Sequence, residues 1–405
     1  MSNDIKSMRG FAFGSICLIL IFAASAAPIP LYGNYCNALA IPKSSLSIAT
    51  VAYFAGTIGS ILVFARLSNY SGRKPAMYLA IGFSIAGCLM FACLSSELML
   101  YAGRFTQGLA CGIAAGSAGA YVVDNAPTKP TWIAAMVTTS GPQAGLTIGC
   151  LMAAGFADID ALDPTWAFLI LATTFVICAI CLAFCPETVE KQHGALRSMT
   201  PSISIPAEVK KILPVCCLAF MGTWAIGGLF QASSTTFSRI CLGSDSTLFS
   251  ALVFAAFMAP SLIGPPLTAR LSARQAQIVG MGSFTGCIAG LAVSISLGNA
   301  GLLLFSSVLG SIAQGAAYSG GMRQVLAKTT LTQNAPVLST VTMLSYLGAA
   351  LPNLLIGILG EGWDIVHIVD GYLIGVALCF VASVVFLRKG FTTNQSNRKE
   401  LSYEQ

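Results

Sequence analysis

Arg104 is the residue whose place in the sequence points most directly to chemistry. It lies within the apolar stretch 98–122 and is followed by Gln107 in the sequence GRFTQG. A guanidinium group inside a lipid-spanning helix costs several kcal/mol unless it faces a polar cavity or finds partners. Two interpretations stay open. The side chain either extends to the nearby outer membrane surface, or it is a cavity-facing cation whose pairing changes with protonation or substrate.

The chain offers little other polar chemistry at membrane depth. Glu97 and Asp370 lie near the ends of apolar stretches, and no Asp or Glu lies deep in any of them. The two histidines, His193 and His367, have no metal-ligand spacing, and no phosphate-binding glycine loop is present. We therefore expect no enzyme, no metal site and no cofactor. Because cavities for organic cations commonly offer a buried carboxylate, Arg104 favours a neutral or acidic amphiphilic substrate.

Composition predicts the elements that must position these residues. The chain has 405 residues, of which 56% are hydrophobic and 9% charged, and its mean hydropathy is +0.79. Apolar stretches of about 18 to 25 residues recur from end to end and are long enough to cross a hydrocarbon core of about 30 Å. We predict an all-α polytopic membrane protein with twelve transmembrane helices, at residues 10–31, 46–67, 76–95, 98–122, 132–157, 165–185, 211–237, 246–269, 276–298, 300–322, 335–360 and 366–387.

The positive charges predict the orientation. Of the 21 Lys and Arg residues, all except Lys43, Arg104 and Arg239 fall in segments on one side of the predicted helices. By the positive-inside rule, both termini are expected in the cytoplasm. As a separate expectation, we place the protein in the inner (plasma) membrane of a bacterium. The net charge of +6 is then a topology signal and gives no reason to invoke nucleic acid. Only Cys36 and Cys241 of the 14 cysteines lie near predicted outer loops, where we expect free thiols, with a disulfide between them as the alternative.

The sequence also indicates an internal duplication. GRFTQG at 103–108 and GSIAQG at 310–315 share one frame, and the basic loop at 65–75 has a counterpart at 265–274. The longest polar segment lies between the two halves and is typical of a solvated linker. We predict two pseudo-symmetric six-helix bundles, with these boundaries: N-terminal bundle 1–185, cytoplasmic linker 186–210, C-terminal bundle 211–390 and cytoplasmic tail 391–405.

Three motifs in this order resemble those of the major facilitator superfamily. The loop at 65–74, ARLSNYSGRK, is similar to the family's G-x-L-x-D-R-x-G-R-K/R pattern, although Asn69 replaces the aspartate and Tyr70 the first arginine. A second motif, R-x-x-Q-G, lies on the fourth predicted helix, and a third, G-P-x-x-G, lies on the fifth. The matching residues are Leu67, Gly72, Arg73 and Lys74 in the first motif, Arg104, Gln107 and Gly108 in the second, and Gly141, Pro142 and Gly145 in the third.

The resemblance is to the twelve-helix drug:proton antiporter branch, and it implies alternating access around a midplane site. It also implies that Arg73 and Asp124 belong to a cytoplasmic latch, together with Gly72, Lys74 and Asn69. Gly141, Pro142 and Gly145 would form an antiporter-type interface that limits leakage. We expect proton-coupled export of a small lipophilic compound by a monomer in the lipid bilayer. Proton-coupled uptake and a membrane sensor on the same fold stay open as alternatives.

Candidate substrate-binding residues are polar or aromatic positions on the predicted helices. Packing against a neighbouring helix is the alternative for each of them. The candidates are Tyr32, Tyr53, Gln107, Gln143, Trp224, Gln231, Gln314, Tyr318, Tyr346 and Asn353. Gln107 and Gln314 are the strongest of these, because the repeat places them at equivalent sites.

Overall fold

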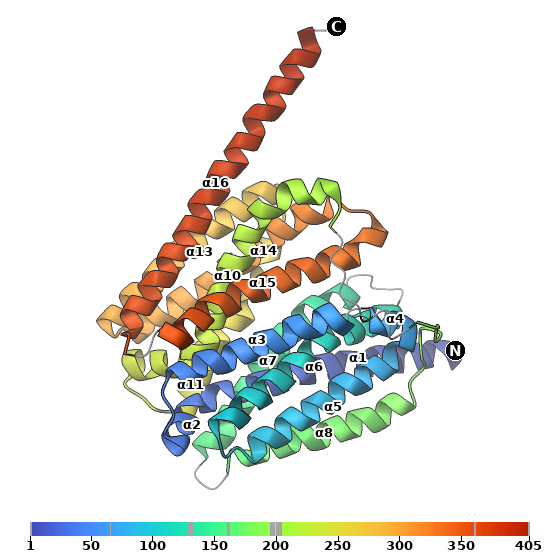
Figure 1. Ribbon diagram of the computed structural model, residues 1–405, viewed down its shortest axis with the longest axis vertical. Helices are drawn as coiled ribbons and strands as arrows, with labels where there is room; N and C mark the ends of the chain where they lie inside the picture. The colour runs from blue at the N-terminus through green and yellow to red at the C-terminus, as the bar shows by residue number, and fades with distance from the viewer. Residues whose placement is uncertain are drawn as a thin grey trace. The chain divides into compact units, whose positions relative to one another are not determined.

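The computed structural model describes residues 2–64, 66–127, 133–159, 163–194, 199, 205–359 and 362–403, and for residues 2–5, 135, 331–336 and 387–403 it describes the backbone alone. Every regular element within these residues is an α-helix or a 3-10 helix (Figure 1). In chain order they are α1 (Ser2–Ala26), η1 (Ile29–Leu31), α2 (Tyr32–Leu39), α3 (Ser44–Phe64), α4 (Leu67–Ser71), α5 (Arg73–Ala92), α6 (Glu97–Asp124), α7 (Ile133–Asp158), α8 (Thr165–Ala183), α10 (Ala207–Leu242), α11 (Thr247–Met258), η2 (Ala259–Ile263), α12 (Gly264–Leu267), α13 (Ala273–Leu297), α14 (Ala300–Leu326), α15 (Leu331–Leu359) and α16 (Ile365–Tyr403).

Each apolar stretch that the sequence predicts as a membrane helix is helical over most of its described residues. Within the described chain, 10 helical segments are long and apolar enough to cross a membrane. The other two predicted spans, α6 and α7, are 28 and 26 residues long, but they carry polar residues such as Arg104 and Gln143 that lower their hydropathy. The protein is therefore an all-α, multi-pass integral membrane protein, with ten of the twelve predicted spans confirmed by length and hydropathy.

Polar caps and prolines explain where several helices begin and break. Ser96 caps α6 by accepting a hydrogen bond from the backbone N–H of Met99, and Ser272 forms a capping box with Gln275 at the start of α13. The first predicted span is not one helix, since the 3-10 turn η1, which contains Pro30, separates α1 from α2. A proline lacks the N–H that a continuous helix requires, so the helix breaks at this point.

The chain divides into two compact units, and these are not the two predicted bundles. Unit 1 contains 1–203, 227–259 and 349–363, and unit 2 contains 204–226, 260–348 and 364–405. The end of α10, all of α11 and the end of α15 thus group with the first half of the sequence. The predicted division into bundles at 185 and 211 stays a prediction.

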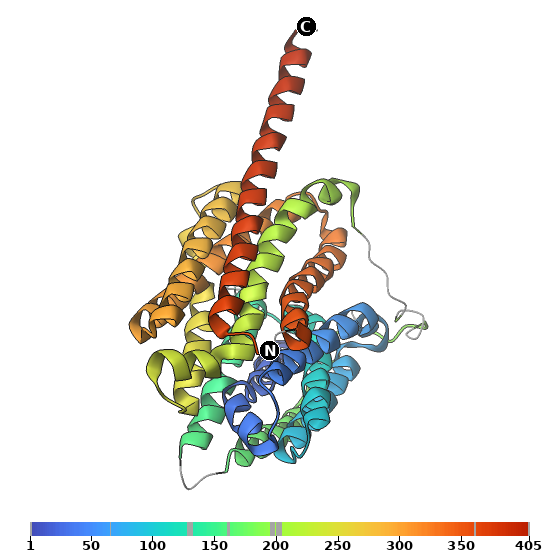
Figure 2. The same ribbon diagram turned by 60° about the vertical axis from the view of Figure 1, so that its left-hand side comes forward.

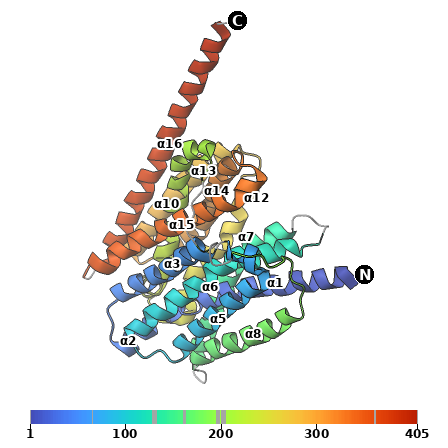
Figure 3. The ribbon, with the colours of Figure 1, turned by 45° about the vertical axis from the view of Figure 1, so that its right-hand side comes forward.

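Within unit 1, α6 is the central helix. It packs against α1, α3 and α5, while α7 packs against both α1 and α11, and α5 lies beside α8 (Figures 1 and 3). A Cβ atom at Gly108 would clash with the carbonyl oxygen of Tyr53, so the α3 and α6 backbones touch there. Small residues permit such close approach of membrane helices. Helices α6 and α7 are consecutive membrane spans and therefore cross the membrane in opposite directions. Their last residues, Asp124 and Asp158, thus lie on opposite sides of the membrane.

In unit 2, glycines also allow helices to pack closely. Its most extensive helix–helix packing is between α13 and α14, drawn in yellow and orange in Figure 2. A Cβ atom at Gly315 of α14 would clash with the carbonyl oxygen of Ser261, and one at Gly280 of α13 would lie 2.4 Å from the backbone nitrogen of Ala317, which is too close for any Cβ. An apolar cluster around Phe220 of α10, Val325 of α14 and Val341 of α15 fills the core of this unit.

Candidate functional site

Arg104 is fully buried in unit 1, so the interpretation in which its side chain extends to the membrane surface is wrong. One guanidinium nitrogen, Nη1, donates to the backbone oxygen of Ser25 and to Oε1 of Gln107, the latter at 3.0 Å. The other, Nη2, donates to Oε1 of Gln231 at 3.0 Å. The guanidinium carbon lies 4.5 Å from the centre of the Tyr53 ring, a cation–π geometry. We call these five residues the Arg104 centre.

The Arg104 centre has a positive charge and no negative one. The partners of the guanidinium in the described chain are carbonyl and amide oxygens and an aromatic ring, with no Asp or Glu among them. Its Nε has no hydrogen-bond partner, and neither has the hydroxyl of Tyr32, which is 1% exposed. A buried charge without a counter-charge is costly, and each unpaired buried polar atom adds to that cost. The arrangement is therefore suited to accept a further hydrogen-bond acceptor, above all an anionic one.

The predicted lining residues form two groups. Tyr32 of α2, Tyr53 of α3, Gln107 of α6 and Gln231 of α10 lie around Arg104. Gln107 is additionally held by a 2.8 Å bond from its Nε2 to the backbone oxygen of Ala24. These four residues, far apart in the sequence, therefore form one buried polar centre.

The second group is aromatic and lies in unit 2. The ring centres of Trp224 and Tyr346 are 4.9 Å apart in an edge-on contact, and those of Trp224 and Tyr318 are 6.5 Å apart. Phe220, which sequence reasoning missed, packs at 5.0 Å against Tyr318. Three predicted residues thus form one aromatic surface.

The remaining candidates join neither group. Asn353 is buried in unit 1, where its Nδ2 donates to the backbone oxygen of Ala349 and its Oδ1 has no hydrogen-bond partner. Gln143 on α7 and Gln314 on α14 are each partly exposed. The repeat places Gln314 at the position equivalent to Gln107, but the residue equivalent to Arg104 is Ser311, which carries no charge.

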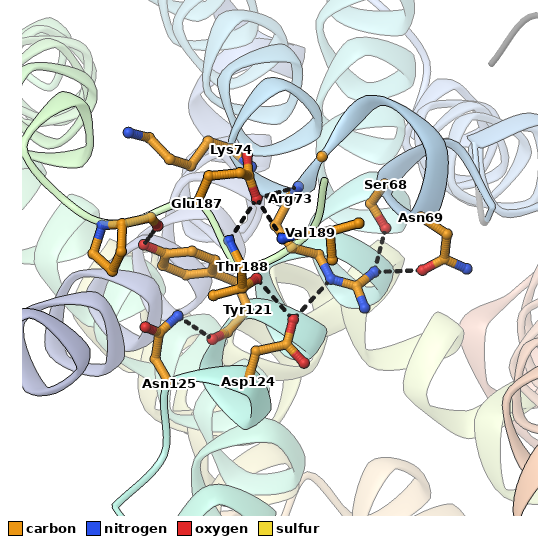
Figure 4. A network of polar contacts seen from close by, with 12 residues as sticks. Ser68, Asn69, Arg73, Lys74, Tyr121, Asp124, Asn125, Glu187, Thr188 and Val189 are labelled. Atoms are coloured by element: carbon orange, nitrogen blue, oxygen red, sulfur yellow. Dashed lines mark hydrogen bonds and ion pairs between the residues drawn. The ribbon is translucent and has the colours of Figure 1, made fainter. Parts of the chain in front are cut away.

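On the Asp124 side of unit 1, the two residues that the sequence pairs do meet. Nε of Arg73 lies 3.0 Å from Oδ2 of Asp124, and Nη1 donates to Oγ of Ser68 at 2.9 Å and to Oδ1 of Asn69 at 2.6 Å (Figure 4). Asn69 therefore still binds Arg73 although it lacks the charge of an aspartate. The hydroxyl of Thr188 also donates to Asp124, at 2.9 Å.

Glu187 is the main residue of this network that sequence reasoning missed. Its carboxylate accepts hydrogen bonds from the backbone N–H groups of Arg73 and Lys74, at 2.9 and 3.0 Å, and so caps the start of α5 (Figure 4). Gly72 has a φ of +97°, and a Cβ atom there would lie 2.7 Å from Oε2 of Glu187, so only glycine fits. The start of the predicted linker is thus bonded to the loop at 65–74 and is not free in solvent. The signal that could have identified it is its position, since Glu187 is the first charged residue after the apolar segment 165–185.

Lys74 and the glycines of α7 have structural partners. Nζ of Lys74 donates to the backbone oxygens of Ala183 and Cys185, at 3.1 and 2.8 Å, and caps the end of α8. In α7, a Cβ atom at Gly145 would clash with the backbone oxygen of Ile19, whereas Gly141 has more room. Pro142 lies within the continuous helix. The G-P-x-x-G motif therefore packs α7 against α1, and its role in limiting leakage stays a prediction.

Three comparisons with known proteins bear on this arrangement. Residues 14–294 match the model of the Major Facilitator Superfamily. The multidrug resistance protein MdtL of Salmonella paratyphi C (strain RKS4594) is 33% identical over 129 residues, which are 31% of this chain and 30% of MdtL. Facilitated glucose transporter member 2 of Rattus norvegicus is 28% identical over 157 residues, which are 37% of this chain and 28% of that protein. Each match thus spans less than a third of the relative.

Two solved structures share the fold. A variant of the nucleoside transporter NupG has a TM-score of 0.71 at 11% identity and covers 93% of this chain and 99% of its own. A POT family transporter in complex with 5-aminolevulinic acid has a TM-score of 0.70 at 14% identity, with coverages of 94% and 95%. At these identities the likeness concerns the fold alone.

Proposed function

We propose that this chain, which belongs to the Major Facilitator Superfamily, is a secondary active transporter that exports small lipophilic compounds, neutral or acidic, by alternating access. The export is driven by the proton gradient across a bacterial inner membrane, and the working unit is a monomer. The partial similarity to MdtL and the G-P-x-x-G motif of α7 support export.

The observation that carries the substrate class is the Arg104 centre. A fixed, fully buried cation without a carboxylate partner repels organic cations and leaves them no counter-charge. A neutral compound can accept a hydrogen bond from Nε of Arg104 or from the Tyr32 hydroxyl, and an acidic compound supplies the missing negative charge as well. The aromatic residues Trp224, Tyr318 and Tyr346 are of the kind that line sites for lipophilic compounds.

The orientation and the latch complete the proposal. The charge distribution assigns the Asp124 side to the cytoplasm, together with both termini, and the Asp158 side to the exterior. The ion pair of Arg73 and Asp124 is then the cytoplasmic latch, which Asn69, Gly72 and Lys74 support. In this scheme the latch is intact in one state of the cycle and separates in the other.

The test is compound accumulation in efflux-deficient cells that express the wild type, Arg104→Ala or Ser311→Ala. The panel contains cationic, neutral and acidic fluorescent or radiolabelled compounds, each measured with and without a protonophore. Ser311→Ala is the matched control, because it changes the equivalent position of the second half. We expect the wild type and Ser311→Ala to lower the accumulation of neutral or acidic compounds, and the protonophore or Arg104→Ala to restore it.

Other results would change the proposal in defined ways. Lower accumulation of the cationic compounds alone would refute the proposal that the substrates are neutral or acidic. Higher accumulation in wild-type cells would establish uptake in place of export. No change across a broad panel would favour a membrane sensor on this fold.

A further inference from the structure

Asp158, the last residue of α7, binds the start of α11 through both of its carboxylate oxygens. Oδ1 accepts from the backbone N–H of Thr247 at 3.0 Å and from the Thr247 hydroxyl. Oδ2 accepts from the Ser246 hydroxyl at 2.5 Å and from the backbone N–H of Leu248 at 3.2 Å. One carboxylate therefore takes four hydrogen bonds from three consecutive residues.

The start of α11 is built to hold this carboxylate. The first N–H groups of a helix have no partner inside the helix, and the helix dipole favours a negative charge there. Ser246 caps α11 by accepting from the N–H of Phe249, at 3.3 Å, so Asp158 is a second cap that comes from another helix. The Thr247 hydroxyl also lies 3.2 Å from the backbone oxygen of Ala154, and Thr247 is buried. These contacts fasten α7 to α11 along one turn.

Asp158 joins segments that are far apart in the sequence. It belongs to the first predicted bundle and Ser246, Thr247 and Leu248 belong to the second, although all of them lie within unit 1. Opening of the exterior side in an alternating-access cycle requires α7 and α11 to separate at these ends. We propose that Asp158 is a lock that holds the exterior ends of α7 and α11 together and that must release before the exterior side opens. This inference rests on the alternating access of the proposed function.

The lock works through a permanent charge. Burial raises the pKa of Asp158, but the hydrogen bonds from Ser246, Thr247 and Leu248 outweigh it and hold this pKa below its usual value. A group with a lowered pKa loses its stabilising effect only as the pH falls through that value, which here lies below 3.8. The nearby ion pair of Arg239 with Asp245, at 2.6 Å, is internal to the α10–α11 connection. The lock therefore stays charged between pH 5 and 8, and conformational change opens it rather than a proton.

Asp163 provides the comparison that separates a lock from an ordinary cap. It lies after α7, and its carboxylate accepts from the backbone N–H of Thr165 at 2.8 Å, at the start of α8. That bond spans neighbouring residues and joins no distant elements. Removing Asp163 should loosen only the start of α8, whereas removing Asp158 should also expose the surface that α7 buries against α11.

The experiment uses the full-length protein in lipid nanodiscs and two readouts that need no transport. Hydrogen exchange followed by mass spectrometry reports on the start of α11. Reaction of Cys150 with a charged maleimide, quantified by peptide mass spectrometry, reports on exposure of the buried surface of α7, because Cys150 is a fully buried free thiol about two turns from Asp158. The variants are Asp158→Ala, Asp158→Asn and Thr247→Val, with Asp163→Ala as the control.

We expect labelling of Cys150 to accelerate at least about tenfold in Asp158→Ala and less in Asp158→Asn and Thr247→Val, as losing hydrogen bonds to a charged group implies. Asp163→Ala should leave it unchanged. Faster exchange at the start of α11 with unchanged labelling would reduce Asp158 to a local cap and overturn the lock. If Asp158→Ala does not fold, unchanged labelling in both other variants overturns it equally. A wild type that exports nothing but labels as expected would refute the proposed export and keep the lock.

Discussion

Helices α6 and α14 occupy equivalent places in the two halves of the sequence, and the residues that they share differ from those that they do not. Gly108 and Gly315 make the same contact, since each leaves room for a backbone oxygen of a neighbouring helix, that of Tyr53 in one case and that of Ser261 in the other. At the preceding turn, however, α6 has Arg104 and α14 has Ser311. The repeat keeps the packing of the helices, but the charge is present in one half only.

This difference indicates that the glycine contacts and the buried charge have different roles in the protein. Close helix contacts are needed twice, because each half must hold its own helices together. A buried guanidinium destabilises the protein unless something pairs with it, so a second copy would add cost. The comparison thus predicts that the glycines matter for folding in both halves and that the cation matters for function in one.

The largest expected effect is on folding. Gly108→Leu and Gly315→Leu each place a side chain where a backbone oxygen lies, so two helices must separate, and we expect no folded monomer to be recovered from either. Fluorescence-detected size-exclusion chromatography of detergent extracts measures this. Gly116→Ala on α6 is the control, because nothing lies within 4 Å of its added Cβ. If only one of the two leucine variants fails to give a folded monomer, Gly108 and Gly315 do not have equivalent roles in folding.

The next effect separates stability from function. Arg104→Met replaces a buried cation that has no counter-charge by an apolar side chain of similar length. The gain from removing the buried charge offsets the loss of the hydrogen bonds to Ser25, Gln107 and Gln231. We expect an unchanged or raised melting temperature together with loss of export. Ser311→Ala should change neither. The measurements are thermal unfolding and the accumulation assay, and a strongly destabilised Arg104→Met would show that the guanidinium is a structural element.

Local sequence patterns predicted most of the fold. Runs of apolar residues with caps such as Ser96 and breaks such as Pro30 are properties of neighbouring residues, and for this reason the helices lie where the sequence places them. The grouping of α11 with the first half was not predicted, because it depends on which distant surfaces meet. The four hydrogen bonds of Asp158 illustrate this, since nothing near Asp158 in the sequence names its partners on α11.

The candidate site was predicted only in part, because some of its residues are marked by local sequence and others only by contacts between distant segments. The rarity of charge at membrane depth singled out Arg104, and the motif resemblance paired Arg73 with Asp124. Glu187 was missed because its polar neighbours are typical of a solvated linker, and its bonds to the start of α5 arise only from tertiary folding. The sequence therefore identifies charged residues whose burial costs free energy, whereas the structure is required to find the partners that offset this cost.

The loops of the two halves offer a smaller contrast. Arg73 pairs with a carboxylate, that of Asp124, whereas Arg323 of α14 donates to the backbone oxygen of Leu271 at 2.7 Å. Side chains of Arg73 and Asp124 are 14% and 30% exposed, so we expect a coupling of about 0.2–1 kcal/mol in a double-mutant cycle with Arg73→Gln and Asp124→Asn. Salt should weaken this coupling, and the effect of Arg323→Gln should depend less on salt.

Thermal unfolding at low and high salt measures both effects. An equal salt response of the two arginine variants would remove the distinction between a loop held by an ion pair and a loop held by backbone oxygens. A coupling between Arg73 and Asp124 that is absent at every salt concentration would instead show that their ion pair adds nothing to the stability of unit 1.

The smallest expected effect sharpens the charge comparison at a single atom. Asn69 already accepts a hydrogen bond from Arg73 at 2.6 Å, so Asn69→Asp adds a charge without a change of geometry. Repulsion by Asp124, which binds the same guanidinium, offsets part of the gain. We expect stabilisation of at most about 0.5 kcal/mol, a rise in melting temperature of about 1–2 °C at low salt that salt removes. In an Arg73→Gln background the stabilisation by Asn69→Asp should vanish. A stabilisation that persists there would mean that the new carboxylate interacts with a cation other than Arg73.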